Sequence, residues 1–98
     1  MKTDFDKRVQ QSIDEMREKY NYSPTVLINM IDKHGTIEAV RRLINSSKTP
    51  YGFTKLWELN ALDLSLEAII LEEKWKNLFS EEDRKKAKKK LIKHDYKK

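Results

Sequence analysis

The sequence predicts an all-α fold: a compact single-domain bundle of five to six short helices with a basic C-terminal helix or tail. Apolar residues recur at steps of three and four along most of the 98-residue chain, which is the spacing of one helix face. No alternating Val, Ile or Thr strand and no Asn-Gly or Asp-Gly hairpin turn is present. The two glycines and two prolines fall at proposed element boundaries, so local and global patterns agree.

The first predicted helix begins after Thr3, which can cap it, with Asp6 in the first turn. Its buried stripe follows steps of four, four, three and four through Phe5, Val9, Ile13, Met16 and Tyr20. The second helix should cover residues 24–34, with Ser23 as cap, Pro24 in the first helical position and Tyr22 stapled onto Leu27. Because residues 26–31 are apolar on most sides, we expect this helix to be the most central element of the core.

Gly35 should end the second helix in a left-handed conformation, and Thr36 should cap the third. The third helix places four apolar residues on one face, namely Ile37, Val40, Leu43 and Ile44. Residues 45–52 contain Ser, Pro and Gly and are expected to form a loop.

A short helix should open at Phe53, carry Leu56, Trp57 and Leu59, and end near residues 60–61. Ser65 is a predicted cap for a fifth helix over residues 66–77, with Leu64 stapled to Ile69. Its apolar residues should form a second core pillar, and they are Leu66, Ile69, Ile70, Trp75, Leu78 and Phe79. Ser80, followed by three acids, predicts the start of a sixth helix that frays after Ile92.

Length and composition exclude several classes of protein. Ninety-eight residues suffice for one hydrophobic core and are too few for a two-domain enzyme with a deep cleft. Without cysteine, neither a disulfide framework nor a thiolate metal site can form. The N-terminus lacks an apolar leader segment, and no apolar run is long enough to cross a membrane. We therefore expect a cytoplasmic protein that does not act at a membrane.

Charge is distributed unevenly along the chain. Residues 84–98 carry nine Lys or Arg and one acid, whereas residues 1–83 carry twelve Lys or Arg and fifteen acids. This difference predicts a slightly acidic helical core over residues 1–83 and a basic helix end and tail over residues 84–98.

Three segments within residues 33–91 carry a resemblance to other proteins: Gly35-Thr36-x-x-Ala39-Val40-x-x-Leu43-Ile44, Gly52-Phe53-Thr54-x-Leu56-Trp57-Glu58, and Leu62-Asp63-Leu64-Ser65-x-Glu67. The pattern resembles a helical module of small uncharacterised bacterial proteins. The resemblance implies a natural, compact helical unit, and it implies no activity, cofactor or catalytic residue.

Few residues point to catalysis. His34 and His94 are far apart in sequence, and His34 suits the C-terminal end of a helix better than a catalytic or ligand role. Glu58, Asp63 and Glu67 could converge on Mg²⁺ or act as acid and base, but helix-start acids and a solvated face explain them more simply. No metalloprotease, phosphate-loop, dinucleotide or calcium-loop motif is present. We expect a protein that is not an enzyme and has no metal or cofactor.

Helices two and three also invite a helix-turn-helix interpretation, because Gly35 lies in a short turn and Arg41-Arg42 follows it. The match is poor, since bulky Ile31 stands four residues before the glycine and few side chains could read bases. Arg41 and Arg42 are more simply ordinary surface residues.

The aromatic residues near the loop are the candidate protein-contact site: Tyr51, Phe53 and Trp57. Helical spacing favours a core position for Phe53, Trp57 and Trp75, which leaves Tyr51, beside Gly52, as the residue expected to remain accessible.

Part of the basic C-terminal charge has a simple helical explanation, because Glu81 can pair with Lys85 and Glu82 with Lys86. The remaining lysines are candidates for nucleic-acid contact, although a solubilising end would have the same composition: Lys88, Lys89, Lys90, Lys93, Lys97 and Lys98.

Two functions are therefore expected. The preferred one is a small non-catalytic helical adaptor or regulator that acts through protein–protein contacts. The alternative is a nucleic-acid-associated protein that binds phosphates nonspecifically through its basic tail. The slightly acidic body favours the first.

Overall fold

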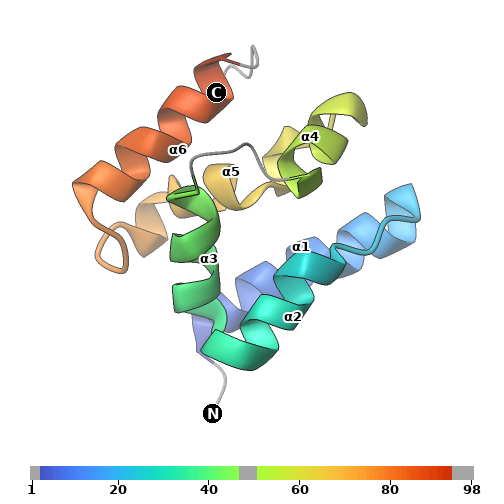
Figure 1. Cartoon of the computed structure of the whole chain (residues 1–98), viewed down its shortest axis with the longest axis horizontal. Helices are drawn as coiled ribbons and strands as arrows, with labels where there is room; N and C mark the ends of the chain where they lie inside the picture. The colour runs from blue at the N-terminus through green and yellow to red at the C-terminus, as the bar shows by residue number, and fades with distance from the viewer. Residues whose placement is uncertain (1–2, 47–50, 94–98) are drawn as a thin grey trace.

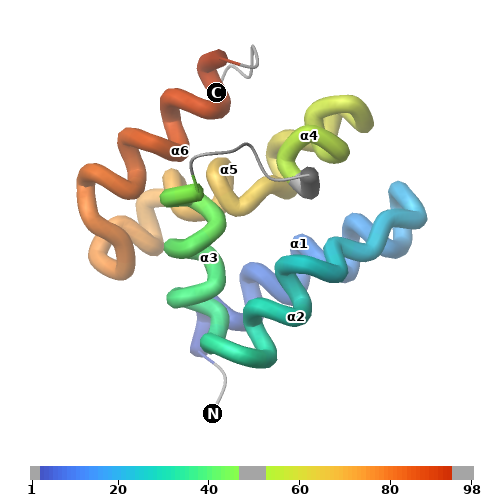
Figure 2. The backbone as a smooth tube through the Cα atoms, in the orientation of Figure 1, coloured from blue at the N-terminus to red at the C-terminus, as the bar shows by residue number. Residues whose placement is uncertain are grey.

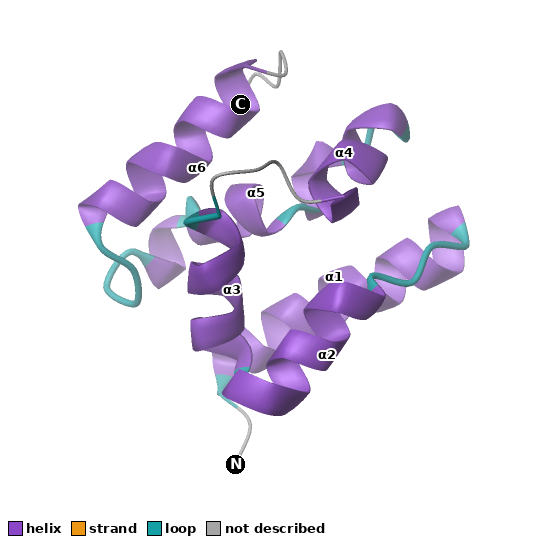
Figure 3. Cartoon of the chain, viewed as in Figure 1, coloured by secondary structure: helices purple, strands orange, loops and turns teal. Residues whose placement is uncertain are grey.

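The computed structural model describes residues 3–46 and 51–93, with no account of the side chains of residues 51 and 52. Within these ranges every regular element is a helix, which confirms the all-α prediction (Figures 1 and 3). The α-helices are α1 (Asp4–Tyr20), α2 (Thr25–His34), α3 (Thr36–Ile44), α4 (Tyr51–Glu58), α5 (Leu66–Ile70) and α6 (Glu81–Lys93). Two short 3-10 helices, η1 (Leu62–Leu64) and η2 (Glu73–Trp75), flank α5.

Helix α1 matches its prediction closely. The Thr3 hydroxyl accepts a hydrogen bond from the Asp6 N–H at 3.2 Å, and the Thr3 N–H donates to the Asp6 carboxylate at 2.8 Å. This reciprocal capping box satisfies two backbone donors that would otherwise lack partners. The helix ends at Asn21, which adopts a left-handed conformation with φ of 51°. The predicted stripe is buried at Phe5, Val9, Ile13 and Met16, and Tyr20 is half-buried.

Helix α3, and not α2, is the most central element, so the prediction for residues 24–34 was wrong. Helix α3 contacts α1, α2, α5 and α6, and Figure 2 shows it between α6 on one side and α1 with α2 on the other. In α2 only Leu27 is buried, and Val26 is 62% exposed. Ala39 and Val40 of α3 are fully buried.

The capping of α2 and α3 also differs from expectation. The Ser23 hydroxyl accepts a hydrogen bond from Arg17 Nε at 3.3 Å, and α2 begins without a side-chain cap. Gly35 has φ of 83°, a positive value that glycine adopts without strain, and it serves both as the end of α2 and as the residue before α3. Thr36 is consequently the first residue of α3 and not its cap. The predicted apolar face of α3 is confirmed, with Val40 and Ile44 buried and Ile37 and Leu43 half-buried.

Ser65 caps α5 as predicted, because its hydroxyl accepts from the Ala68 N–H at 3.2 Å. The helix ends at Ile70, however, and does not continue to residue 77. The Arg84 guanidinium donates to the carbonyls of Ile70 and Leu71 at 3.1 and 3.0 Å, which occupies acceptors that a longer helix would use. Glu72 then adopts an extended conformation and redirects the chain into η2.

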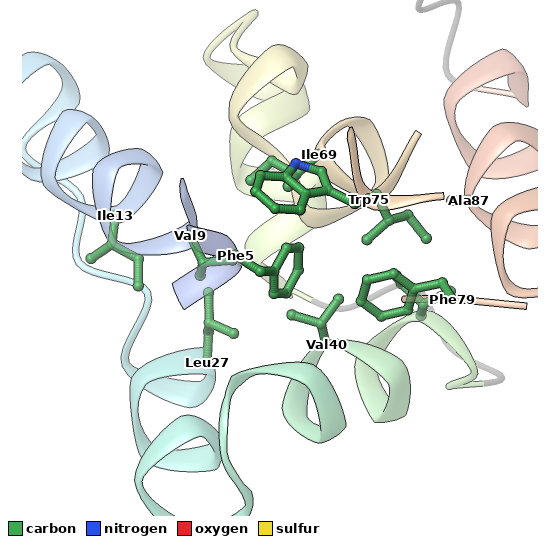
Figure 4. Packing of buried hydrophobic residues seen from close by; sticks show 11 residues of the cluster. Phe5, Val9, Ile13, Leu27, Val40, Ile69, Trp75, Phe79 and Ala87 are labelled. Carbon is green, nitrogen blue, oxygen red and sulfur yellow. The ribbon is translucent and has the colours of Figure 1, made fainter. Parts of the chain in front are cut away.

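The core consists of two clusters. In the first, the Phe5 ring packs edge-on against Trp75 and Phe79, with ring centroids 5.3 and 5.4 Å apart (Figure 4). Trp75 is thus a core residue as expected, whereas Leu78 is 39% exposed. The second cluster joins α1, α4, η1, α5 and α6 through Met16, Phe53, Leu56, Ala61, Leu62, Leu64, Ala68 and Leu91.

Helix α6 is an integral part of this core. Ser80 caps it by accepting from the Asp83 N–H at 3.1 Å, as the sequence predicts. Ala87 is fully buried and Leu91 is 4% exposed. The boundary expected between residues 83 and 84 falls inside this helix, so the hydrophobic core extends to Leu91.

Candidate functional site

The described structure contains an apolar cleft of about 310 Å³. It lies where the α1–α2 turn, the end of α3, helix α4 and the start of α5 meet. Its lining is mostly apolar and consists of Met16, residues 22–27, Leu43, Ser46, Phe53, Leu56 and residues 65–67. We refer to this feature as the apolar cleft.

The turn after α1 builds one wall of the apolar cleft. Left-handed Asn21 reverses the chain, and the Tyr22 N–H donates to the Met16 carbonyl at 3.1 Å. This bond holds the Tyr22–Leu27 segment over the end of α1. Pro24 and Leu27 are buried, whereas Val26, at the rim, is 62% exposed.

Helix α4 supplies the opposite wall. Phe53 and Leu56 are each 3% exposed and line the apolar cleft. The core position that helical spacing favours for Phe53 is confirmed, because its side chain is packed into the wall of the apolar cleft. Trp57 follows Leu56 and is 48% exposed, so the core position favoured by its spacing is also wrong. It remains a protein-contact candidate, and the Tyr51 side chain lies outside the described residues.

Polar groups that line the apolar cleft already have partners. Glu67 is 3% exposed, and its carboxylate pairs with Lys90 Nζ at 3.5 Å. The Ser65 hydroxyl donates to the Leu62 carbonyl at 2.6 Å while it caps α5. No buried side-chain nitrogen or oxygen in the part of the chain that the structure describes lacks a hydrogen-bond partner. The apolar cleft therefore presents apolar contact area and no free titratable group at its floor.

The three carboxylates considered from sequence do not form a common site. Glu58 and Asp63 are exposed, whereas Glu67 is buried in its pair with Lys90. Across residues 3–46 and 51–93, no group of His, Asp and Glu could hold a metal ion. The interpretation of Glu67 as a helix-start acid was incomplete, because it also pairs with Lys90, which lies far away in sequence.

Several basic residues of α6 hold the helix onto the core. Arg84 donates to the end of α5, Lys86 donates to the Asn45 side chain at 2.6 Å, and Lys90 donates to the Ile44 carbonyl at 3.3 Å. Asp83, which is 6% exposed, accepts from Asn45 Nδ2 at 2.9 Å. The expected Glu81–Lys85 and Glu82–Lys86 pairs are not formed; Lys86 reaches across to Asn45 instead.

These contacts revise the set of lysines available for nucleic acid. Lys90 is engaged with Glu67 and Ile44, so its assignment as a phosphate contact was wrong. Lys88, Lys89 and Lys93 are exposed. Lys97, Lys98 and His94 lie outside the described residues.

Arg41 and Arg42 are surface residues, as the simpler interpretation proposed. Arg42 Nε lies 2.9 Å and Arg41 3.4 Å from the Glu38 carboxylate, and Arg41 also lies 3.7 Å from Asp83. The Arg42 hydrogen bond, aided by the charges of both arginines, lowers the pKa of Glu38. These neighbours neutralise the arginines that a recognition helix would use for phosphate contact. His34 is exposed at the end of α2, as expected.

The chain matches no known protein family, no curated protein and no solved structure. Among the helices that the structure describes, none is long and apolar enough to cross a membrane.

Proposed function

We propose that this protein is a small non-catalytic helical binding module that acts in the cytoplasm through protein–protein contacts. Its apolar cleft receives an apolar side chain of the partner. The observation that carries the proposal is an open, apolar cleft of about 310 Å³ whose rim carries the exposed Val26 side chain.

The size of the apolar cleft sets what it can receive. A cavity of about 150 Å³ holds a benzene molecule, so one of about 310 Å³ accommodates one or two large apolar side chains. Pockets that bind small molecules have volumes of at least about 300 Å³. The apolar cleft is close to this lower limit, so it has little room for a large cofactor.

The apolar surface next to the cleft favours a protein over a small molecule. Val26, which lines the apolar cleft, is 62% exposed and extends its apolar area beyond the hollow itself, and Trp57 on α4 is 48% exposed. A small ligand confined to the cleft would leave that area in water, whereas a protein segment can cover both. Tryptophan is also enriched among residues that dominate binding free energy at protein interfaces.

Selection from a random peptide library displayed on phage tests the proposal with the full chain as target. We expect the enriched peptides to contain Leu, Phe or Trp anchors. Val26→Lys should weaken the binding of a selected peptide at least about tenfold, because it places a charge at the rim of an apolar site.

Ile92→Lys is the matched control. Ile92 is also a β-branched residue in a helix and is also 62% exposed, but it lies on α6 and does not line the apolar cleft. Its replacement should leave peptide affinity unchanged within about twofold. Equal losses in both variants, or enriched peptides without apolar anchors, would contradict the proposal.

A further inference from the structure

The basic residues of α6 fall into two sets, one that donates to described residues outside α6 and one that does not. The inner set, Arg84, Lys86 and Lys90, donates to Ile70 and Leu71, Asn45, and Ile44, respectively. The outer set, Lys85, Lys88, Lys89 and Lys93, is exposed. Figure 1 shows α6 at one edge of the molecule, where one side of the helix faces away from α3 and α5. We call the four outer lysines the outer lysine face.

The outer lysine face is continuous along the helix. Lys85, Lys89 and Lys93 follow one another at intervals of four residues, and Lys88 lies three residues after Lys85. Side chains at these intervals are neighbours on a helix surface. At 1.5 Å of rise per residue the face extends about 12 Å along α6.

No ion pair within the described residues involves these four lysines. No hydrogen bond within those residues joins any of them to a carboxylate either, although Glu81 and Glu82 begin the same helix. Lysines three or four residues apart on a helix repel each other. The macrodipole stabilises Lys93 in the last turn, but it does not favour Lys85 in the first half of the helix.

We propose that the outer lysine face binds the phosphate backbone of a nucleic acid without reading its sequence. A row of cations that forms no ion pair with the described residues complements a row of phosphates, and release of condensed counterions from the nucleic acid drives such binding. Lysine ammonium groups act as point charges and lack the bidentate geometry that identifies bases. This inference is independent of the apolar cleft, which lies on other elements.

Nucleic acid suits the outer lysine face better than an anionic membrane. Insertion into a lipid surface needs a broad apolar face beside the cations. Here Ala87 and Leu91 are buried in the core, and Ile92 is the single exposed apolar residue that the structure describes on α6.

The test measures binding of the full chain to a fluorescent 20-base-pair DNA duplex of random sequence by anisotropy at several salt concentrations. Each neutralised phosphate contributes about −0.9 to the slope of log K against log salt concentration. The variant K89Q/K93Q should therefore reduce the magnitude of the slope by about 1.8 and weaken binding similarly for unrelated duplex sequences.

The variant K7Q/K33Q is the charge-matched control, because it also removes two exposed lysines, but from α1 and α2. It should leave the slope unchanged. Equal effects of the two double variants would overturn the inference, since a general response to net charge would then explain binding. Absence of duplex binding at low salt would also overturn it, as would tighter binding to phosphatidylserine vesicles than to the duplex.

Discussion

The two ends of α1 pack into hydrophobic clusters that differ in how completely they are filled. At its start, Phe5 is enclosed by the edge-on rings of Trp75 and Phe79. At its end, Met16 belongs to the same cluster as Phe53 and Leu56, and these three residues line an open hollow of about 310 Å³. The first end is filled and the second is incomplete. In the function proposed above, the aromatic end supplies stability, while the other end leaves apolar surface for a partner.

Replacing a buried side chain by alanine at each end of α1 should separate these roles most strongly. Phe5→Ala removes a side chain that is 1% exposed together with two aromatic contacts, and should lower the free energy of unfolding by about 3–5 kcal/mol. Met16→Ala should cost about 2 kcal/mol, because its neighbourhood is already open. Urea denaturation followed by circular dichroism measures both. A larger loss for Met16→Ala would reverse the assignment of the two ends.

The buried Glu67–Lys90 pair tests whether the wall of the cleft depends on α6. Lys90→Met leaves the Glu67 carboxylate without its cationic partner in a buried setting and should destabilise the protein by about 2 kcal/mol. Lys89→Met, one residue away and exposed, should change stability by less than about 0.5 kcal/mol. Thermal unfolding of the two variants compares them directly, and similar midpoints would show that the pair contributes nothing.

Fluorescence should distinguish the exposed Trp57 from the buried Trp75. Trp57 is 48% exposed and Trp75 is 5% exposed, so iodide should quench the first far more than the second. In Trp57→Phe, the remaining emission should be shifted to shorter wavelength and resist iodide, at a cost in stability below about 0.5 kcal/mol. Emission from this variant that iodide still quenched strongly would place Trp75 outside the core.

Removing the charge of Glu38, a carboxylate near the surface, should have the smallest effect on stability, in contrast to the loss of the partner of buried Glu67. The Arg42 hydrogen bond lowers the pKa of Glu38 from 4.5. Folding therefore favours the ionised form, and the stabilisation is present above pH 4.5 and lost as pH falls through the lowered pKa. The difference in melting temperature between wild type and Glu38→Gln should be slight at pH 7 and vanish at strongly acidic pH. A difference that persisted in acid would exclude ionisation of Glu38 as its cause.

Sequence reasoning identified the features that local chemistry determines. The caps at Thr3, Ser65 and Ser80 and the positive φ of Gly35 each depend on a few adjacent residues. The stripe of α1 follows from its regular apolar spacing. The all-α fold could be predicted for the same reason, because it is the sum of these local preferences.

The errors arose where residues far apart in sequence decide the outcome. The end of α5 depends on Arg84, which donates to Ile70 and Leu71 from a different helix. Likewise, the sequence alone left Lys90 as a candidate for phosphate contact, but in the fold it pairs with Glu67. Helical spacing favoured a core position for Trp57, but its side chain on α4 is exposed. The apolar cleft could not be predicted, because it is the space that several elements leave between them.

The burial of Ala87 and Leu91 has a practical consequence for fragments of this chain. A fragment that ends at Asp83 would lose both core residues and the Arg84 contacts that end α5. Its failure to bind any ligand would report unfolding and not the loss of a basic binding surface. A fragment that ends after Lys93 keeps every contact described for α6, so point substitutions or that longer fragment are the sound tools for separating stability from binding.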